Sequence, residues 1–460
     1  MVKGARYSEP MTTLEETGLQ RRVKSRQLQM IAFGSAIGTG LFLGSADSIQ
    51  YAGPAVLLSF AIVGVIVFFL MRMLGEMAVE HPTSGSFAAY SREYIGRWAG
   101  FITGWNWWFT TIVVGMLEMT ALGTFLDFWF PGFPHWITAL VSLIVVLGLN
   151  LLRVSVFAET EYWLSLAKVT ALVLMIILGL LLVFGLGPEP AIGTQHLTAH
   201  GGFMPNGISG VMFALVAVTF TFGGIMSIGT AAGEADDPDH AIPRAVRSVI
   251  WRILVFYIGG IGTILLLAPW NEQESNESPF IRVLTGVGYE GAATLLNVVI
   301  VIAVASVLNT MTYSGARTLR DLARSGQAPA ALAKTSEKGL PINALLFNGA
   351  LMGVVVILNY FFEGKIFAVL LAIIVGTELI TWAGICVSHL NFRKRMDAAG
   401  KESHFKAPLY PVSNWICIVF FIAVLAMMAY LPEYRMGLFT LVAWILTLTI
   451  IGNVRKRWVK

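Results

Sequence analysis

The chain alternates between long apolar runs and short polar segments. A helix needs about 20 mostly apolar residues to cross the hydrocarbon core of a membrane, and twelve runs of about this length are separated by charged residues or by Gly and Pro. They cover residues 28–49, 53–79, 98–126, 135–152, 162–186, 207–232, 249–269, 291–314, 342–361, 366–390, 412–430 and 437–452. The pattern predicts an all-α, polytopic membrane protein with twelve transmembrane helices.

The composition supports this prediction and excludes other classes of protein. Of the 460 residues, 56% are apolar and 13% are charged, about half the charged share of a soluble domain. The formal net charge of +4 is too small to indicate a nucleic-acid partner. The 46 glycines are typical of membrane helices, in which small residues allow close packing.

Residues that could form a metal centre or a catalytic group are scattered. Of the seven histidines, only His196 and His200 have a spacing known from metal sites. The two cysteines, Cys386 and Cys417, lie in apolar runs without metal-ligand spacing. We therefore expect no metal, no cofactor and no enzymatic activity.

The basic residues predict the orientation in the lipid bilayer, because cytoplasmic loops carry an excess of Lys and Arg. If the spans alternate, 26 of the 31 basic residues lie on the side that holds both termini, which should therefore be cytoplasmic. Three basic residues lie on the other side, and Arg72 and Lys168 remain within spans. Residues 1–27 lack the apolar run of a secretory signal, so we interpret them as a cytoplasmic arm.

Two of the predicted spans are interrupted by small residues. The first contains three glycines between Gly34 and Gly40, and the sixth contains Gly223 and Gly224 after Phe220. Such residues can mean close helix packing, but a glycine also weakens a helix by about 1 kcal/mol relative to alanine. Interrupted helices at corresponding positions of two halves are the strongest sequence indication of a transporter site.

The interval of five spans between the two interruptions predicts two inverted repeats. Five is an odd number, so the repeats would lie in opposite directions across the membrane. We assign residues 28–190 to the first repeat, 207–390 to the second, and 412–460 to two further helices and a cytoplasmic tail. Free N–H groups at one break would suit a carboxylate and free carbonyl groups at the other an ammonium, which together fit an α-amino acid.

Several longer segments resemble the bacterial amino acid permeases of the amino acid/polyamine/organocation superfamily. The resemblance extends from about residue 20 to 450, and its motifs are GSAIGTGLFLG at 34–44, MRMLGEMA at 71–78, HPTSGSF at 81–87, AGEADDP at 232–238, IPRA at 242–245 and SVIWR at 248–252. It implies the leucine-transporter fold, with helices 1 and 6 broken, and proton-coupled uptake of amino acids across a bacterial cytoplasmic membrane by alternating access.

The resemblance also implies positions for the substrate. Amide groups around Gly38, Thr39 and Gly40 would hold the carboxylate, carbonyl groups of Ala36, Phe220 and Gly223 would hold the amino group, and Phe220 would act as a gate. With the side chains that could line the site, the expected substrate-binding residues are Ser35, Ala36, Gly38, Thr39, Gly40, Met116, Phe220, Gly223, Gly224, Met226 and Asn309. The mostly apolar lining favours a neutral side chain, aromatic or large aliphatic, although core packing explains such residues as readily.

Three charged residues deep within spans are candidates for proton coupling, because a charge in a membrane helix is costly. Lys168 lies about two turns into the fifth span, where the resemblance implies a stand-in for the sodium ion of related symporters; the alternative is a lysine that snorkels to the inner face. Glu118 could couple protons, contact the substrate or make a structural hydrogen bond. Glu378 could couple protons, contact the substrate side chain or pair with a cation.

Two further positions qualify the mechanism. Many relatives carry a glutamate where this chain has Met226, which cannot titrate, so coupling would pass to Lys168, Glu118 or Glu378.

Arg72 and Glu76 are one helical turn apart, a spacing that predicts an ion pair. The function that we expect is import of an amino acid by proton symport; the alternatives are an exchanger or facilitator, a channel, and a sensor of the same fold.

Overall fold

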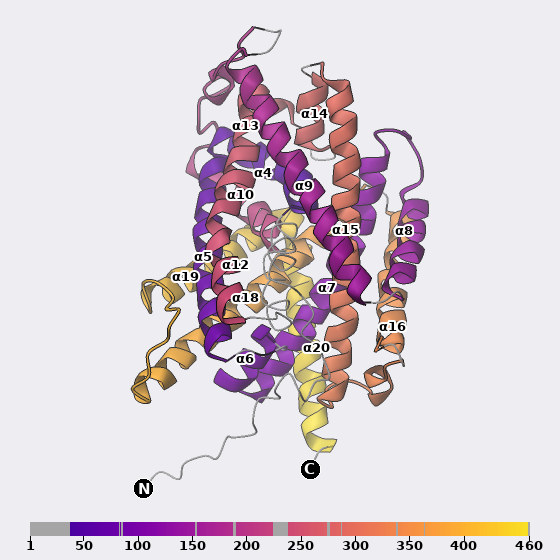
Figure 1. The fold of residues 1–460 in the computed structure, drawn as a ribbon, viewed down its shortest axis with the longest axis vertical. Coiled ribbons are helices and arrows are strands. Elements are labelled where there is room, and N and C mark those ends of the chain that lie inside the picture. Colours follow the sequence, from indigo (N-terminus) through magenta and orange to yellow (C-terminus); the bar gives the residue numbers. More distant parts are fainter. Residues whose placement is uncertain are drawn as a thin grey trace.

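The structure, a computed structural model, describes residues 37–81, 83, 86–151, 154–186, 190–223, 238–273, 277–286, 288–336, 339–362 and 364–458. Every regular element within these ranges is a helix (Figure 1). The first half contains α3 (Thr39–Phe42), α4 (Gly44–Ala52), α5 (Val56–Glu80), α6 (Ser86–Tyr94), α7 (Arg97–Leu126), α8 (His135–Asn150), α9 (Val154–Val183) and α10 (Gly207–Thr221).

The second half is helical in the same way. It contains α12 (Pro238–Arg252), α13 (Gly260–Leu267), α14 (Pro279–Gly286), α15 (Glu290–Arg324), α16 (Ile342–Met352), α17 (Val354–Phe361), α18 (Ile366–Ala398), α19 (Val412–Tyr430) and α20 (Pro432–Trp458). A π-helical segment, η4 (Ile253–Gly259), joins α12 to α13, and short 3-10 helices occupy Gly53–Ala55, Gln195–Leu197, Trp270–Glu272 and Ala330–Ala333.

Nine segments of the described chain are long and apolar enough to cross a membrane. They are Gly44–Glu80, Arg97–Leu126, Glu161–Val183, Ile242–Leu267, Glu290–Arg324, Ile342–Phe361, Ile366–Ala398, Val412–Tyr430 and Pro432–Asn453. The apolar helices α8 and α10 are shorter, and α4 and α5 belong to one segment. A polytopic helical membrane protein is thereby confirmed, whereas twelve crossings and the inverted repeat stay predictions.

Gly53 allows the chain to turn between α4 and α5. Its φ of +60° lies in the region that glycine adopts without strain. A side chain there would also collide with Pro205, because an added Cβ would lie 2.5 Å from the Pro205 Cγ atom. Pro54 follows at the start of the 3-10 turn, where its missing N–H group costs no hydrogen bond.

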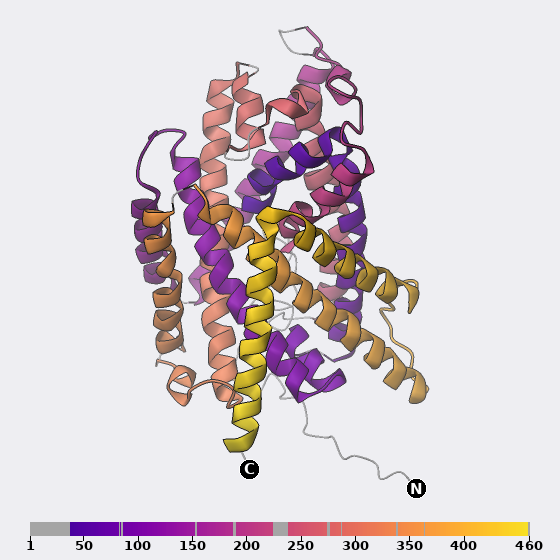
Figure 2. The same cartoon turned by 180° about the vertical axis from the view of Figure 1, so that it is seen from behind.

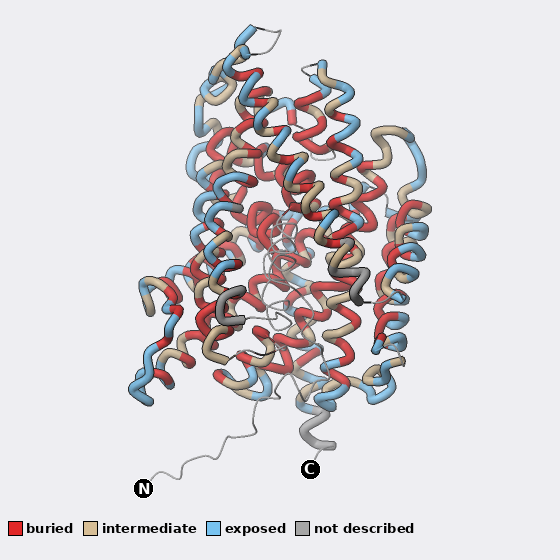
Figure 3. Tube along the Cα trace, in the orientation of Figure 1, coloured by how far each residue is buried: buried red, intermediate tan, exposed pale blue. Residues whose placement is uncertain are grey.

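The long helix α7 forms the centre of the bundle. It packs against α15 and α18, and most of its residues are buried (Figures 1 and 3). The outer helices instead expose large apolar side chains; examples are Val141 and Ile144 on α8, Val419 and Ile422 on α19, and Phe439 and Ile450 on α20. Apolar side chains on the outer surface of such a bundle face lipid rather than water.

Glu76 does not form the predicted ion pair with Arg72. Its carboxylate accepts hydrogen bonds from Arg393 at 2.8 Å and from the Ala407 amide at 2.6 Å, and it lies 2.9 Å from His389 Nε2. Arg72 donates to the carbonyl oxygen of Lys406 and lies over the Phe405 ring. The prediction was wrong because α18 and the segment before α19 bring stronger partners to the buried carboxylate than its own helix offers.

The contact between α18 and α20 depends on one glycine. Figure 2 shows the face on which α20 packs against α18, and an added Cβ at Gly437 would lie 2.2 Å from the Ala372 carbonyl oxygen. Backbone on one helix thus touches backbone on the other, the arrangement that small residues permit in membrane helices.

We predict that Gly437→Ala lowers the free energy of unfolding by about 1 to 3 kcal/mol, since the two helices must separate to admit a methyl group. Gly148→Ala is the matched control, because Gly148 of α8 has open space around it, and it should stabilise the helix by up to about 1 kcal/mol. Thermal unfolding of the purified protein in detergent measures both. Equal shifts for the two variants would contradict the prediction.

Candidate functional site

The described part of the first predicted span begins at Ile37, and the first helix within this part is α3, which begins at Thr39. Gly38 precedes α3 in an extended conformation, and no side chain caps the helix. The first N–H groups of a helix have no partner within it, and this holds for α3. Thr39 and Gly40 are buried. Ser35 and Ala36 lie outside the described residues.

The helix of the sixth predicted span, α10, ends at Thr221, before its expected end at residue 232. The Phe222 amide turns back to the Thr219 carbonyl oxygen at 3.2 Å. Tyr257 belongs to the π-helical segment η4, and its hydroxyl group donates to the Thr221 carbonyl oxygen at 3.2 Å. Gly223 follows, and Gly224 and Met226 lie outside the described residues.

The start of α3 and the end of α10 touch each other. The Thr221 hydroxyl group donates to the Gly40 carbonyl oxygen at 3.1 Å. A Cβ atom at Gly40 would lie 2.8 Å from the Thr221 Cα atom, and one at Gly44 would lie 3.1 Å from the Phe220 ring. Two of the glycines in the first span therefore serve this contact, and the close-packing interpretation applies to them.

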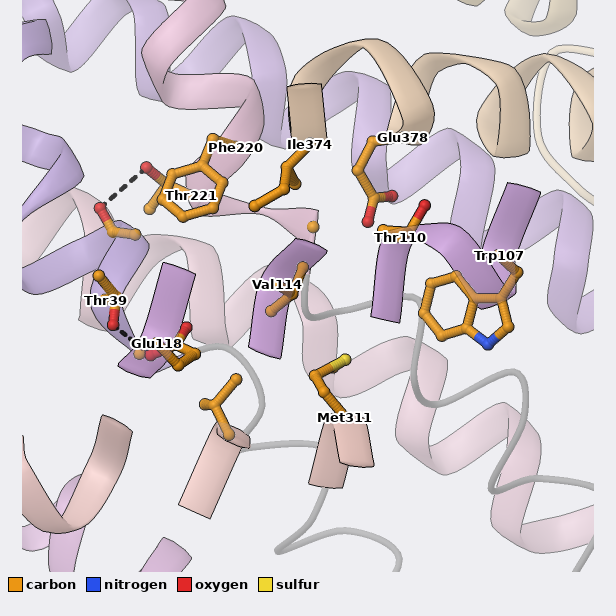
Figure 4. A pocket seen from close by; sticks show the side chains of 14 residues that line it. Thr39, Trp107, Thr110, Val114, Glu118, Phe220, Thr221, Met311, Ile374 and Glu378 are labelled. Atoms are coloured by element: carbon orange, nitrogen blue, oxygen red, sulfur yellow. Dashed lines mark hydrogen bonds between the residues drawn. The ribbon is translucent and has the colours of Figure 1, made fainter. Parts of the chain in front are cut away.

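A pocket opens where these ends meet α7, α15 and α18 (Figure 4). Its lining consists of Gly38, Thr39, Gly40, Trp107, Thr110, Val114, Glu118, Phe220, Thr221, Gly223, Val307, Met311, Ile374 and Glu378. Five of the expected substrate residues, Gly38, Thr39, Gly40, Phe220 and Gly223, are among them. Both carboxylate candidates, Glu118 and Glu378, line the pocket as well.

The two buried carboxyl groups have different surroundings. The Thr39 hydroxyl group donates to Glu118 Oε2, so this carboxyl group is tied to the start of α3. Glu378 is only 2% exposed, and its Oε2 atom has no hydrogen-bond partner among the described residues. Its Oε1 atom packs against Gly223, where an added Cβ would lie 3.1 Å away.

Lys168 lies in a cluster beside the pocket rather than in its lining. The side chain is fully buried and does not reach the protein surface, contrary to the snorkelling interpretation. Its Nζ atom donates to Ser306 Oγ at 2.9 Å and lies 3.5 Å from Glu161 Oε1, and Ser306 donates to the same Glu161 oxygen at 2.5 Å. Glu118 contributes to the electrostatic potential at Lys168.

Two expected lining residues lie elsewhere. The Asn309 side-chain oxygen accepts a hydrogen bond from Asn150 of α8 at 2.8 Å, so Asn309 joins α15 to α8. Met116 is half-buried and is absent from the pocket lining. Rotation about the helix axis decides such positions, and one sequence with a nearly uniform apolar face does not reveal it.

Sequence reasoning missed Trp107, Thr110 and Val114, although a signal was present. These residues and Glu118 recur at intervals of three or four along α7, so they share one face of the helix. Counting back in helical steps from Glu118 would have found them. The described residues contain no group of three or more potential metal ligands.

Comparison with known proteins gives the family. The sequence model of the amino acid permease family matches residues 27–460. The aromatic amino acid transport protein AroP of Escherichia coli K12 is 41% identical over 432 residues, 94% of each chain. AroP of Salmonella typhimurium LT2 is 39% identical over 432 residues, again 94% of each chain. The uncharacterized transporter YdgF of Bacillus subtilis 168 is 37% identical over 445 residues, 96% of this chain and 97% of its own.

These similarities cover nearly the whole chain, far more than a shared motif would. They confirm the predicted family, and they make the chain a transporter rather than an enzyme. The pocket lies between the start of α3 and the end of α10. The chain belongs to the amino acid permease family and is a membrane transporter of amino acids.

Proposed function

We propose that this protein imports aromatic amino acids together with protons, by alternating access to the pocket between α3, α7, α10, α15 and α18. The observation that carries the proposal is the meeting of two helix ends at a pocket with an apolar wall and buried carboxyl groups. The relatives named as aromatic amino acid transport proteins support the substrate class.

The two helix ends suit the charged groups that all amino acids share. The N–H groups at Gly38, Thr39 and Gly40 would receive the carboxylate, because a helix N-terminus favours an anion. Carbonyl groups of Phe220 and Gly223, beyond the last full turn of α10, would receive the ammonium group. Phe220 lies over Gly44 and would cover the bound substrate.

The walls suit an aromatic side chain. Val114, Met311 and Ile374 lie in the middle of the pocket, with Trp107 farther along it (Figure 4). Methionine and branched aliphatic side chains adapt to a flat ring and bury its surface. An aromatic residue of about 150 to 250 Å² gains more from such burial than a small aliphatic one.

Coupling to protons would pass through Lys168 and Glu118. Lys168 is held by Ser306 of α15 and Glu161 of α9, and Glu118 is held by Thr39 at the substrate site. A proton that moves on or off this pair changes the charge beside the start of α3, and so changes how well that site holds an anion. Glu378 lies against Gly223, and we do not assign coupling to it.

The same proposal includes the remaining architecture. The two inverted repeats, residues 28–190 and 207–390, would move against each other, and both termini would face the cytoplasm of the bacterial cell. In Figure 1 the lower ends of α15 and α20 lie on the same side as α6. The helices that end on this side carry Arg92, Arg317, Arg324 and Arg395. Basic residues gathered at one end agree with a cytoplasmic side.

The first prediction concerns transport itself. In liposomes containing the purified protein, labelled phenylalanine, tyrosine or tryptophan should accumulate when the outside is more acidic than the inside. Accumulation should stop when a protonophore removes the gradient. Accumulation without any proton gradient would contradict proton coupling, equilibration without accumulation would indicate a facilitator or channel, and binding without flux would indicate a sensor.

The second prediction concerns Lys168. Lys168→Arg keeps a cation next to Glu161 but cannot release its proton in the physiological range, so accumulation should fall to the level without a gradient while exchange of substrate across the membrane persists. Lys334→Ala, at an exposed lysine, is the control and should accumulate normally. Because Lys168→Ala would leave Glu161 buried without its cation, the double variant Glu161→Gln/Lys168→Met tests the same role in a neutral cluster. Normal accumulation by Lys168→Arg would refute the role.

The third prediction concerns the contact between the helix ends. Gly40→Ala should weaken amino acid binding by about 5- to 100-fold, because its Cβ would push Thr221 and the α10 end away from α3. Gly262→Ala is the control, since the nearest atom to its added Cβ is 4.0 Å away. Binding of labelled substrate to protein in detergent measures both. Unchanged affinity in Gly40→Ala would place the amino acid elsewhere.

A further inference from the structure

The ion pair of Lys168 and Glu161 is costly for a membrane helix. Both side chains lie inside the bundle, Lys168 with no exposed surface and Glu161 with 3%. A buried ion pair often stabilises a protein no better than apolar residues of similar volume, and a charge within a membrane-spanning segment usually has a function. Proton coupling through Lys168 accounts for one member of the pair and leaves Glu161 without a role.

Ser306 connects the two charges by a chain of hydrogen bonds. It belongs to α15, which packs against α9 (Figure 1). Lys168 Nζ donates to Ser306 Oγ at 2.9 Å, and Ser306 Oγ donates to Glu161 Oε1 at 2.5 Å. The direct distance from Lys168 Nζ to Glu161 Oε1 is 3.5 Å, longer than an ordinary N–H···O hydrogen bond. The short route between the two charges therefore passes through the Ser306 hydroxyl group.

A hydroxyl group in this position can pass a proton, because it accepts on one side and donates on the other. When the Lys168 ammonium group gives a proton to Ser306 Oγ, the proton already on that oxygen moves to Glu161 Oε1. One Nζ–H bond breaks, one Oε1–H bond forms, and the serine has one proton before and after. The ion pair becomes a neutral amine and a neutral carboxylic acid, and no further reactant takes part.

The route leads from the pocket toward the predicted cytoplasmic side. Glu161 precedes Lys168 by seven residues on α9, which is about 10 Å along a helix with a rise of 1.5 Å per residue. In the predicted topology, this fifth span starts on the cytoplasmic side. Glu118, whose charge also acts on Lys168, lines the pocket. Lys168 therefore stands between one carboxyl group at the substrate site and another nearer to the predicted cytoplasm.

The elements packed against α9 bring few other titratable groups to this cluster. The charges of Glu161 on α9 and Glu118 on α7 act on Lys168. The helix α13 has no titratable side chain, and the Tyr257 hydroxyl group of η4 is bonded to a carbonyl oxygen of α10. On α15 the titratable residue nearest to the serine is Tyr313, about two turns away. The two glutamates are thus the carboxyl groups placed to exchange protons with Lys168.

We propose that Glu161 releases the transported proton to the cytoplasm, after Ser306 has passed it on from Lys168. Glu161 is buried in this structure, so release takes place when alternating access opens this side of the bundle. This inference rests on the proposed function, since it assumes proton-coupled import through Lys168. The proton then enters beside the substrate at the pocket and leaves along α9.

The first test uses two variants of equal size that differ in one hydroxyl group. Ser306→Thr keeps the hydroxyl group, Ser306→Val removes it, and both leave the two charges in place. In liposomes with an inward proton gradient, Ser306→Thr should retain most of the accumulation of labelled phenylalanine. Ser306→Val should accumulate it about 100-fold more slowly, as expected for loss of a group that transfers a proton. Exchange of labelled for unlabelled phenylalanine requires no net proton movement and should persist in both.

The second test changes the pH on one side only, with the membrane potential clamped. At a fixed acidic pH outside, lowering the pH inside the liposomes should slow initial uptake by the wild-type protein, because Glu161 must lose its proton to the inside. Glu161→Gln should take up phenylalanine slowly at every internal pH and still exchange it.

Glu159→Gln is the matched control on the same helix. Glu159 accepts a hydrogen bond from Trp163 at 3.1 Å, and the ring of Tyr162 packs against the same exposed tryptophan. The control removes a carboxylate from the predicted cytoplasmic half of α9 without changing Glu161. Its uptake should respond to internal pH as that of the wild-type protein does.

Other outcomes overturn the inference in distinct ways. Normal accumulation by Ser306→Val, or equal losses in Ser306→Thr and Ser306→Val, would refute the relay. Uptake by Glu161→Gln that still slows at acidic internal pH would assign proton release to another group, and loss of exchange in this variant would make the ion pair structural. Thermal unfolding shows which variants are folded, and the two Ser306 variants decide the question if Glu161→Gln does not fold. If the wild-type protein does not accumulate aromatic amino acids with protons, the proposed function itself fails.

Discussion

Backbone polar groups inside a membrane must find partners within the protein, and this constraint organises the whole structure. Water is absent from the hydrocarbon core, so an N–H or C=O group without a partner is costly there. A helix can stop inside the bundle only where another group receives its free end. Here α3 begins and α10 ends at the same place, with Thr221 bonded to Gly40 and Tyr257 bonded to Thr221. The pocket opens at this meeting point, so our proposal assigns substrate binding to the place where the two helices are interrupted.

Buried charged side chains are subject to the same constraint as the backbone groups. The charges at Lys168 and Glu161 do not stand alone within the bundle, because Ser306 bridges them and holds both in one cluster. Glu118 has a single described donor, Thr39. The number of partners therefore differs between the titratable groups, and the more weakly held groups are those that adjoin the space where a substrate would sit. Two buried glutamates thus have different surroundings: Glu161 lies in a cluster with Lys168 and Ser306, and Glu118 lines the pocket.

The sequence patterns predicted where helices lie along the chain better than which face of each helix points into the bundle. Apolar runs bounded by Gly, Pro and charge located long helices such as α5, α7, α18 and α19 closely, because a run of about 20 apolar residues is typical of a membrane-spanning helix. They did not predict the short helices α6 and α14 or the early end of α10. Glycine clusters indicated where helix ends would meet, and Gly40 and Gly223 are indeed in the pocket lining. Asn309 and Met116 were placed wrongly with respect to the pocket lining, because a helix that is apolar all round does not reveal which side faces inward. Glu76 shows the other limit: spacing along one helix suggested Arg72, but partners from distant segments decided the pairing.

The Glu76 cluster also constrains how the sequence can change. Arg393, His389 and the Ala407 amide all act on one buried carboxylate, while Asn414 contacts His389 at 3.2 Å and the Cys386 carbonyl oxygen at 3.0 Å. Substituting one member leaves the others with buried charge or polar atoms unmatched, so the effects of substitutions within the cluster are not additive. These positions on α5, α18 and α19 are therefore expected to change together in evolution or not at all. A substitution at only one of them would give a less stable protein.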